Sequence, residues 1–290
     1  MNGYCLNRPP RRVVSLVPSL TESLFDLGLG ETLVGITDYC LYPARPLLGL
    51  PHVGGPKNPR AADIIALAPD LILANQEENA PGVVKFLQQA GLQVWISFPK
   101  SVRESLQVLY CLADIFRSQA AVLRVDTLDL AVKMLESSRA DLPSRRYFCP
   151  IWQDRSQSGQ RWWMTFNKET YSSDLLYWLG GENVFADRQK RNPLEADLGQ
   201  ASVDDKVEGD RRYPRLSLEE IRSANPELIL LPDEPYKFNE NHISEFCELF
   251  PEVEAVRKGK VILVDGSLIT WYGTRLGKAI SELQALFPSK

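Results

Sequence analysis

The sequence predicts an α/β protein of two similar Rossmann-like lobes with parallel sheets, joined by a long bridging helix. Three observations lead to this prediction. Apolar strand-like runs alternate with helical patterns in both halves of the 290-residue chain, which is typical of parallel sheets covered on both faces. One helix and strand unit occurs twice, and a long amphipathic pattern separates the halves. We expect an N-terminal α/β lobe over residues 11–100, the bridging helix over 101–138 and a C-terminal α/β lobe over 145–290.

The N-terminal lobe follows from four short apolar runs separated by helical patterns. The strand-like runs read RVVSLV, LVGITDY, DLILAN and QVWISF, and the helical ones read LTESLFDLG, AADIIALA and PGVVKFLQQAG. Buried strands of this length that alternate with helices favour a parallel sheet. We expect this lobe to end near Pro99.

A long helix is predicted after Pro99. Ser101 and Glu104 have the spacing of a capping box. Apolar residues then recur at helical spacing: Val102, Leu106, Leu109, Leu112, Ala113 and Phe116. The pattern continues to about Ser138, with a candidate break near Ser118. A continuous helix of this length would span about 57 Å, which suits a bridge between two lobes.

The C-terminal lobe resumes the alternation and repeats one unit of the first lobe. Its strand-like runs read RYFCPIW, WWMTF, ELILLP and KVILVD, and a last helix is expected from about Thr274. The run DIIALAPDLIL, which starts at Asp63, matches EIRSANPELIL, which starts at Glu220. In each, a short helix is stopped by proline, which forces the preceding residue to be extended and leads into a buried strand.

A polar stretch lies between Asp187 and Arg212 and has little periodicity. We expect a solvated loop there. The alternative is a calcium site formed by Asp197, Asp204, Asp205 and Asp210. Because their spacing matches no established loop geometry, we predict no bound metal.

Composition argues against several classes of protein. The formal net charge is −4 and no long basic run is present, so a nucleic-acid partner is not expected. The sequence contains no span of about 20 apolar residues that could insert into a membrane. The five cysteines are scattered, which favours reduced thiols. Residues 1–12 lack the apolar core of a signal peptide. We therefore predict a cytoplasmic location, with a periplasmic one as the alternative if the start is truncated.

No catalytic motif stands out in the sequence. The run GTRLGK at Gly273 has three residues between its glycines where a phosphate-binding loop has four, and Ala279 replaces the Ser or Thr that would hold magnesium. Two histidines are too few for a metal site made of imidazoles. Neither Ser19 nor Ser173 has the GxSxG surroundings of a hydrolase nucleophile. We predict no catalytic residue, no metal site and no intrinsic cofactor.

Aromatic and polar side chains gather instead at the predicted strand ends, where open α/β sheets bind ligands. They occur in the runs TDYCLYP, GGPKNP, NQEEN and WWM and near Trp271. On this ground we predict ligand contacts by Tyr39, Lys57, Gln76, Glu77, Trp163 and Tyr272. Glu77 and Glu78 place negative charge there, which favours a cationic or hydroxyl-rich ligand over a carboxylate siderophore. A weaker alternative is acid–base chemistry by Asn75 with these two glutamates.

The order of the motifs resembles a known family, the helical-backbone (class III) substrate-binding proteins of ABC importers. The runs that carry the likeness are VSLVPSLTESLF, GITDYCLYP, VGGPKN, IIALAPDLILA, NKETYSSDLLYWLGGENVF and LSLEEIRSANPELIL. The likeness covers nearly the whole chain and is greatest to the vitamin B12-binding receptors. It implies a non-enzymatic protein that holds a corrinoid or iron chelate in the cleft between two lobes, with cobalamin, haem and iron-siderophores as candidate ligands.

The resemblance also implies a set of ligand contacts. By position these are Pro18, Ser19, Tyr39, Pro56, Asn75, Met164, Tyr213 and Trp271. Tyr39 and Tyr213 keep aromatic rings, which suit packing on a flat macrocycle. Pro56 and Asn75 replace tryptophans of the vitamin B12 receptors, so the choice among cobalamin, haem and siderophore chelates stays open.

A membrane partner is implied as well. In the family, a surface glutamate on each lobe pairs with arginines of an ABC permease. Glu219 matches one of these positions, whereas Ala62 occupies the other, with Asp63 next to it. A shift of one residue turns a helical side chain by about 100°, so Asp63 is an imperfect substitute.

A second hypothesis is a cytosolic sensor, scavenger or enzyme-like descendant of the receptor fold that no longer serves transport.

Overall fold

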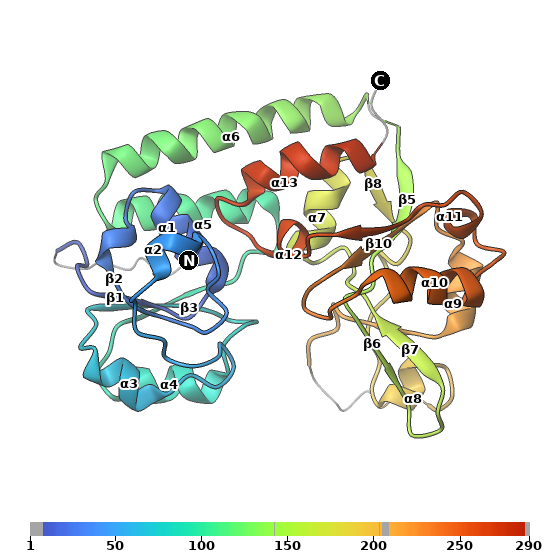
Figure 1. Cartoon of the computed structure of the whole chain (residues 1–290), viewed down its shortest axis with the longest axis horizontal. Coiled ribbons are helices and arrows are strands. Elements are labelled where there is room, and N and C mark those ends of the chain that lie inside the picture. The colour runs from blue at the N-terminus through green and yellow to red at the C-terminus, as the bar shows by residue number, and fades with distance from the viewer. Residues whose placement is uncertain (1–7, 142, 203, 205–208, 288–290) are drawn as a thin grey trace. The chain divides into compact units, whose positions relative to one another are not determined.

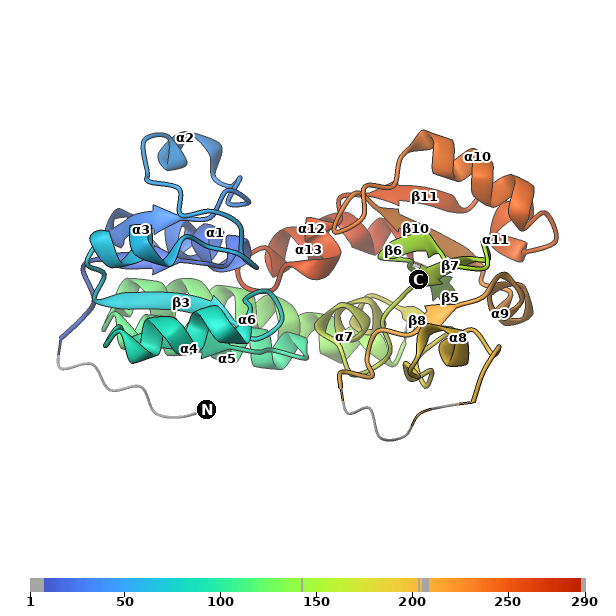
Figure 2. The same ribbon diagram turned by 90° about the horizontal axis from the view of Figure 1, so that it is seen from below.

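The computed structural model describes residues 8–141, 143–202, 204 and 209–287 (Figures 1 and 2). The chain divides into two compact units. The first runs to Lys133 and includes Trp271–Gly277, and the second comprises Met134–Thr270 and the residues from Lys278 on. Each unit is described in turn.

Unit 1 contains a four-stranded parallel sheet in the order β2-β1-β3-β4. The chain winds from β1 through α1 to β2, and then returns past β1 to form β3 and β4. The winding therefore reverses between β1 and β3, which is the point where open α/β sheets bind ligands. The strands are β1 (Val13–Ser15), β2 (Leu33–Ile36), β3 (Leu71–Asn75) and β4 (Val94–Ser97). The helices before Pro99 are α1 (Pro18–Asp26), η1 (Gly30–Thr32), α2 (Ala44–Leu47), α3 (Ala61–Ala66) and α4 (Pro81–Gln89).

One core cluster of unit 1 lies between this sheet and helices α3 and α4. Figure 1 shows these two helices side by side, and they contact each other directly. Ile64 of α3 and Leu87 of α4 are fully buried against Ile72 of β3. Burying a side chain of this size contributes about 2 kcal/mol, so the apolar faces of these helices fix them on the sheet.

Unit 2 repeats the winding of unit 1. Its parallel sheet has the order β11-β10-β5-β8, in which β5, β8, β10 and β11 take the places of β1, β2, β3 and β4. The strands are β5 (Arg145–Phe148), β8 (Gly181–Asn183), β10 (Leu228–Pro232) and β11 (Val261–Val264). The predicted α/β class with two parallel-sheet lobes is confirmed. The helices are α7 (Tyr171–Trp178), α8 (Leu194–Asp197), α9 (Leu218–Ala224), α10 (Glu240–Leu249), α11 (Glu254–Arg257), α12 (Ser267–Thr270), α13 (Leu276–Leu283) and η2 (Gln284–Leu286).

Unit 2 also contains a small antiparallel sheet that the sequence did not predict. It has the order β6-β7-β9, formed by β6 (Trp152–Arg155), β7 (Arg161–Met164) and β9 (Arg215–Leu216). The hairpin β6-β7 is inserted between β5 and α7, and β9 lies between β8 and α9. Both insertions follow the carboxyl ends of parallel strands.

The single bridging helix expected over 101–138 is in fact two helices. They are α5 (Val102–Ile115) and α6 (Gln119–Arg139), and Arg117 between them has a left-handed φ of 49°. The left-handed conformation ends a helix. The boundary between the units falls within α6, and Trp271–Gly277, expected in the C-terminal lobe, belongs to unit 1.

The predicted repeat is confirmed in detail. Helix α3 leads into β3, and α9 leads into β10. The acidic residue after each proline accepts a hydrogen bond from a backbone N–H of the neighbouring segment: Asp70 from Arg12 at 3.0 Å and Glu227 from Arg146 at 2.8 Å. Each arginine side chain in turn donates to the last carbonyls of the short helix, at Leu67 and Ala224. The same two hydrogen bonds of an arginine therefore connect a helix end to a strand in both units.

Candidate functional site

The candidate site of unit 1 lies where the winding of its sheet reverses. Pro18 and Ser19 form the first turn of α1, directly after β1, and both are buried. Asn75 ends β3 on the other side of the reversal. Parallel strands bring their carboxyl ends to one edge of the sheet. The structure therefore brings together three of the predicted residues.

A buried asparagine that the sequence analysis did not select joins the loops at this edge. Asn79 donates from Nδ2 to the carbonyl oxygens of Leu16, at 3.1 Å, and Pro56, at 3.0 Å. Its Oδ1 accepts from the backbone N–H of Asn75 at 2.7 Å. Since its side chain is 2% exposed, these bonds replace water for three loops at once. This residue ends the run NQEEN, and no local pattern in that run predicts that its final asparagine points inward.

Asn75 itself is buried, with 2% of its surface exposed. Its Oδ1 accepts from the backbone N–H groups of Glu77 and Glu78, at 2.7 and 3.2 Å. Its Nδ2 donates to the hydroxyl of Tyr272 at 3.2 Å. The structure therefore gives Asn75 an internal role, in which it shapes the turn after β3, and its side chain is not presented at the surface as the sequence prediction implied.

Tyr272 is also buried, with 5% exposed. Its hydroxyl lies 2.7 Å from Ser97 Oγ at the end of β4. Burial raises the pKa of Tyr272, and the nearby charge of Glu78 raises it further, so the hydroxyl stays protonated and can serve as a donor. The segment that contains Tyr272 is thus attached to the carboxyl ends of β3 and β4, and its ring is not available as a surface contact.

The other predicted residues of unit 1 are more accessible. Tyr39, after β2, is 63% exposed. Lys57 and Gln76 are exposed, and Pro56, Glu77 and Trp271 are partly exposed. The Nζ of Lys57 donates to the backbone carbonyl of Glu77. This bond brings the loop that follows Gly54 to the turn after β3, so Lys57, Gln76 and Glu77 lie near one another at this edge.

Three predicted residues of unit 2 lie in the small antiparallel sheet or beside it. Met164 ends β7, pairs with Trp152 across the hairpin, and is partly exposed. Tyr213 lies just before β9, where Pro214 accepts a backbone hydrogen bond from Thr165 at 3.0 Å. Trp163 was predicted as a ligand contact, but its side chain is fully buried among Phe246 and Phe250. Its ring packs into the core of unit 2, which corrects that prediction.

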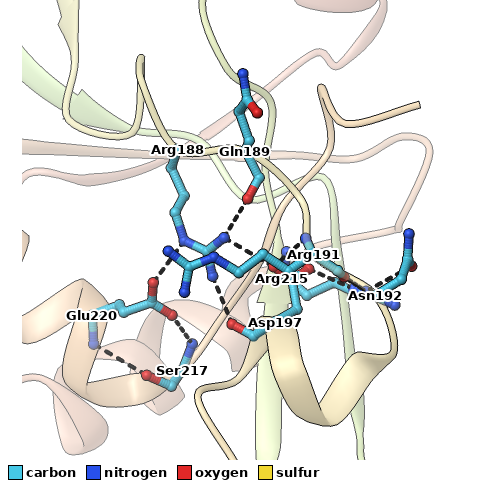
Figure 3. Close-up of polar contacts among 8 residues, drawn as sticks. All are labelled: Arg188, Gln189, Arg191, Asn192, Asp197, Arg215, Ser217 and Glu220. Carbon is cyan, nitrogen blue, oxygen red and sulfur yellow. Dashed lines mark hydrogen bonds and ion pairs between the residues drawn. The ribbon is translucent and has the colours of Figure 1, made fainter. Parts of the chain in front are cut away.

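The polar stretch after Asp187 is ordered around a buried charge cluster rather than being wholly a solvated loop. Asp197 has no exposed side-chain surface, and its carboxylate lies 2.9 Å from Arg188 and 2.8 Å from Arg215 (Figure 3). Arg188 also reaches Glu220, the capping-box residue of α9, at 2.8 Å. The carboxylate is therefore committed to arginines, which excludes it from the alternative calcium site. Asp205 of that alternative lies outside the described residues.

The two predicted docking residues lie on the repeated helices. Asp63 of α3 is half exposed and pairs with Arg60 at 2.5 Å. Glu219 of α9 is well exposed and lies 3.8 Å from Arg222. By the repeat, the counterpart of Asp63 is Glu220, which is turned toward Arg188. The two predicted docking residues are therefore not equivalent positions of the repeat.

The described part of the chain contains neither a cluster of metal-binding side chains nor a membrane-spanning helix. It holds no group of three or more His, Cys, Asp or Glu side chains that could bind a metal ion. Its cysteines Cys40, Cys111, Cys149 and Cys247 are not in disulfides, while Cys5 lies outside the described residues. No helix within these residues combines the length and apolar character needed to cross a bilayer.

Comparison with known proteins places the chain in a family. Residues 13–268 match the family described as Periplasmic binding protein. An uncharacterised ABC transporter substrate-binding lipoprotein of Bacillus subtilis (strain 168) is 25% identical over 291 residues, which cover 98% of this chain and 82% of that protein. The vitamin B12-binding protein of Yersinia pestis (strain Pestoides F) is 28% identical over 221 residues, which cover 76% of this chain and 69% of that protein.

Solved structures show the same fold. The periplasmic vitamin B12-binding protein BtuF of Vibrio cholerae aligns with a TM-score of 0.74 and 22% identity over 96% of both chains. The periplasmic heme-binding protein RhuT from Roseiflexus sp. RS-1 aligns with a TM-score of 0.70 and 20% identity over 96% of this chain and 97% of that one.

These relatives contradict one expectation from the sequence. The Bacillus subtilis relative is named as a lipoprotein and both solved structures are named as periplasmic proteins, so the predicted cytoplasmic location is wrong. They also do not favour the alternative of a cytosolic sensor, scavenger or enzyme-like descendant. The family consists of substrate-binding receptors rather than enzymes, and a match that covers most of the sequence decides the assignment: this chain belongs to the periplasmic binding protein family.

Proposed function

We propose that this chain binds a corrinoid or metal chelate outside the cytoplasm and delivers it to an ABC permease. The match to the periplasmic binding protein family over residues 13–268 carries this proposal. Relatives named for vitamin B12 and heme support the ligand class. The expectation that the ligand lies between the two lobes stays a prediction from the resemblance.

In unit 1, the proposed contacts are the exposed side chains at the carboxyl edge of the sheet. Tyr39 offers an aromatic face, which suits a flat macrocycle. Lys57, Gln76 and Glu77 offer polar groups beside the turn that Asn75 and Asn79 hold in shape. Buried amides thus support an exposed set of side chains, the arrangement that a preorganised binding surface needs.

In unit 2, we propose contacts by Met164 and Tyr213. Both belong to the antiparallel sheet region, which the buried cluster around Asp197 ties to α9. Glu219 on α9 and Asp63 on α3 are proposed to pair with basic residues of the permease, because each carries an exposed carboxylate.

Titration tests the ligand class directly. Purified protein is titrated with hydroxocobalamin, hemin and ferrichrome, and binding is followed by calorimetry and visible absorbance. Saturable one-site binding of at least one of them is expected. If none of the three binds, the proposed ligand class is rejected.

A further inference from the structure

A buried arginine in unit 1 contacts two aromatic rings that also contact each other. The guanidinium carbon of Arg275 is 4.3 Å from the ring centroid of Tyr42 and 4.9 Å from that of Trp271. The two rings approach edge to face, with centroids 6.0 Å apart and planes at 70°. Both distances lie within the range of cation–π attraction. The cation therefore holds two rings that come from distant parts of the sequence.

The position of Arg275 is fixed from several directions. Its Nε lies 3.1 Å from Glu22 Oε2 on α1, and only 3% of the residue is exposed. The neighbouring backbone is anchored as well, since Gly273 donates its N–H to Ser105 Oγ at 2.8 Å and Thr274 Oγ1 donates to Asp26 at 2.6 Å. Gly273 has a left-handed φ of 95°, and a Cβ there would collide with Ser23. The guanidinium thus has little freedom to move.

The two rings, by contrast, reach the surface. Tyr42 is 41% exposed, and Trp271 is partly exposed. Tyr42 lies three residues after Tyr39, in the segment that follows β2, and Trp271 immediately precedes Tyr272, which is hydrogen-bonded to the ends of β3 and β4. The pair therefore lies beside the candidate site of unit 1.

We propose that Arg275, held by Glu22, is a positioning residue that fixes Tyr42 and Trp271 as aromatic walls for the planar ring of the ligand. This proposal rests on the proposed function and adds Tyr42 to the ligand contacts. A ring that is fixed before the ligand arrives loses less conformational freedom on binding. A tethered pair of aromatic faces also suits a flat conjugated macrocycle better than a compact hydrophilic chelate.

The competing explanation is that Arg275 only fastens the segment Trp271–Gly277 to unit 1. A fastening role predicts lower stability without a specific effect on affinity, and a positioning role predicts that the effect on affinity passes through the rings. A double-mutant cycle separates the two, because only the positioning role makes the losses non-additive.

The test compares affinity for hydroxocobalamin and hemin among four proteins. The Arg275→Met/Glu22→Gln double variant removes both charges and leaves no buried ion unpaired. It is compared with the wild type, Tyr42→Leu and the triple variant. We expect the double variant and Tyr42→Leu each to bind about tenfold more weakly, and the triple variant to lose no more than either. Arg275→Lys keeps the charge but not the planar group, and it is expected to retain part of the affinity that the double variant loses.

A matched control exists in unit 2, where Arg139 stacks on Tyr177 at 4.5 Å and Tyr177 is 48% exposed. Arg139→Met removes the same kind of contact at residues that are not among the proposed ligand contacts, and it should leave affinity unchanged. A readout that needs no ligand is the fluorescence emission of Trp271, obtained as the spectrum of the wild type minus that of Trp271→Phe. This emission should shift in the double variant.

The outcomes separate this inference from the function on which it rests. Unchanged affinity in the double variant, or fully additive losses in the triple variant, would overturn the positioning role while leaving the proposed function intact. A wild-type protein that binds none of hydroxocobalamin, hemin and ferrichrome, together with an unshifted Trp271 emission, would overturn both.

Discussion

The two units share one winding, yet they differ at the carboxyl ends of their sheets. In unit 1 the chain passes from β1 straight into α1, and the edge is shaped by buried amides. In unit 2 a hairpin follows β5, a third short strand follows β8, and a buried cluster of charged side chains holds the insertion (Figure 3). The repeated part supports the sheet, and the part that differs forms the candidate contacts. The proposed ligand contacts are therefore separate from the residues that support the sheets.

The largest effect should come from the charge cluster of unit 2. Asp197→Ala would leave Arg188 and Arg215 without their shared carboxylate, and breaking a buried pair of this kind costs about 3–5 kcal/mol. Urea denaturation measures the loss. Asp187→Ala, which removes an exposed carboxylate paired with Lys168, is the control and should cost less than about 1 kcal/mol. Equal losses in the two variants would contradict a special role for Asp197.

The amide network of unit 1 should come second. Asn79→Ala removes three hydrogen bonds from a buried position, and unsatisfied buried groups cost about 1–3 kcal/mol each. We expect a loss of roughly 3 kcal/mol, because water can reach some of the freed carbonyls. Asn58→Ala, at an exposed asparagine two residues after Pro56, should be close to neutral. A loss below about 1 kcal/mol for Asn79→Ala would mean that the loops hold their shape without it.

The repeat itself allows a smaller test. Ala68 and Asn225 occupy equivalent positions at the ends of α3 and α9, and both have left-handed φ angles, of 44° and 41°. Asparagine tolerates this conformation, whereas alanine pays about 1 kcal/mol or more. Ala68→Gly should therefore raise the free energy of unfolding by about 1 kcal/mol. Asn225→Gly should not, since it loses the hydrogen bond that Oδ1 accepts from Glu254 at 2.8 Å. A destabilised Ala68→Gly protein would refute the equivalence.

The smallest effect should be a pH dependence confined to unit 2. Burial lowers the pKa of His242, and the charge of Arg161 lowers it further. The folded state then favours the neutral imidazole, so its contribution to stability is present above the ordinary pKa of about 6.5 and is lost as the pH falls below it. NMR titration of His52→Gln, which leaves His242 as the only histidine, measures this pKa. A value above 6.5 would reverse the expected sign.

Much of the fold was predictable because the signals are local. Buried strands, proline stops and the match between the runs at Asp63 and Glu220 depend on neighbours in the sequence. The break in the long helix was suspected near Ser118, but the left-handed Arg117 that makes it carries no strong sequence signal. The antiparallel sheet was missed because strands as short as Arg215–Leu216 show no periodicity.

The candidate site was less predictable, because exposure depends on contacts between distant segments. Trp163 and Tyr272 were predicted as contacts on residue type, yet one faces the core and the other is bonded to Ser97. Asn79 and Arg275 were overlooked because their partners lie far away in the sequence. Resemblance supplied positions such as Tyr39, but only the structure shows which side chains are exposed.

The proposed function assigns ligand binding in unit 1 to exposed side chains at the carboxyl edge of its sheet. Tyr39 tests it most directly, because its ring is 63% exposed and its removal should not disturb the fold. The decisive measurement is a calorimetric titration of wild type and Tyr39→Ala with whichever of the three probes the wild type binds. We expect Tyr39→Ala to bind at least tenfold more weakly than the wild type, with an unchanged free energy of unfolding. Equal affinity in the two proteins would contradict it.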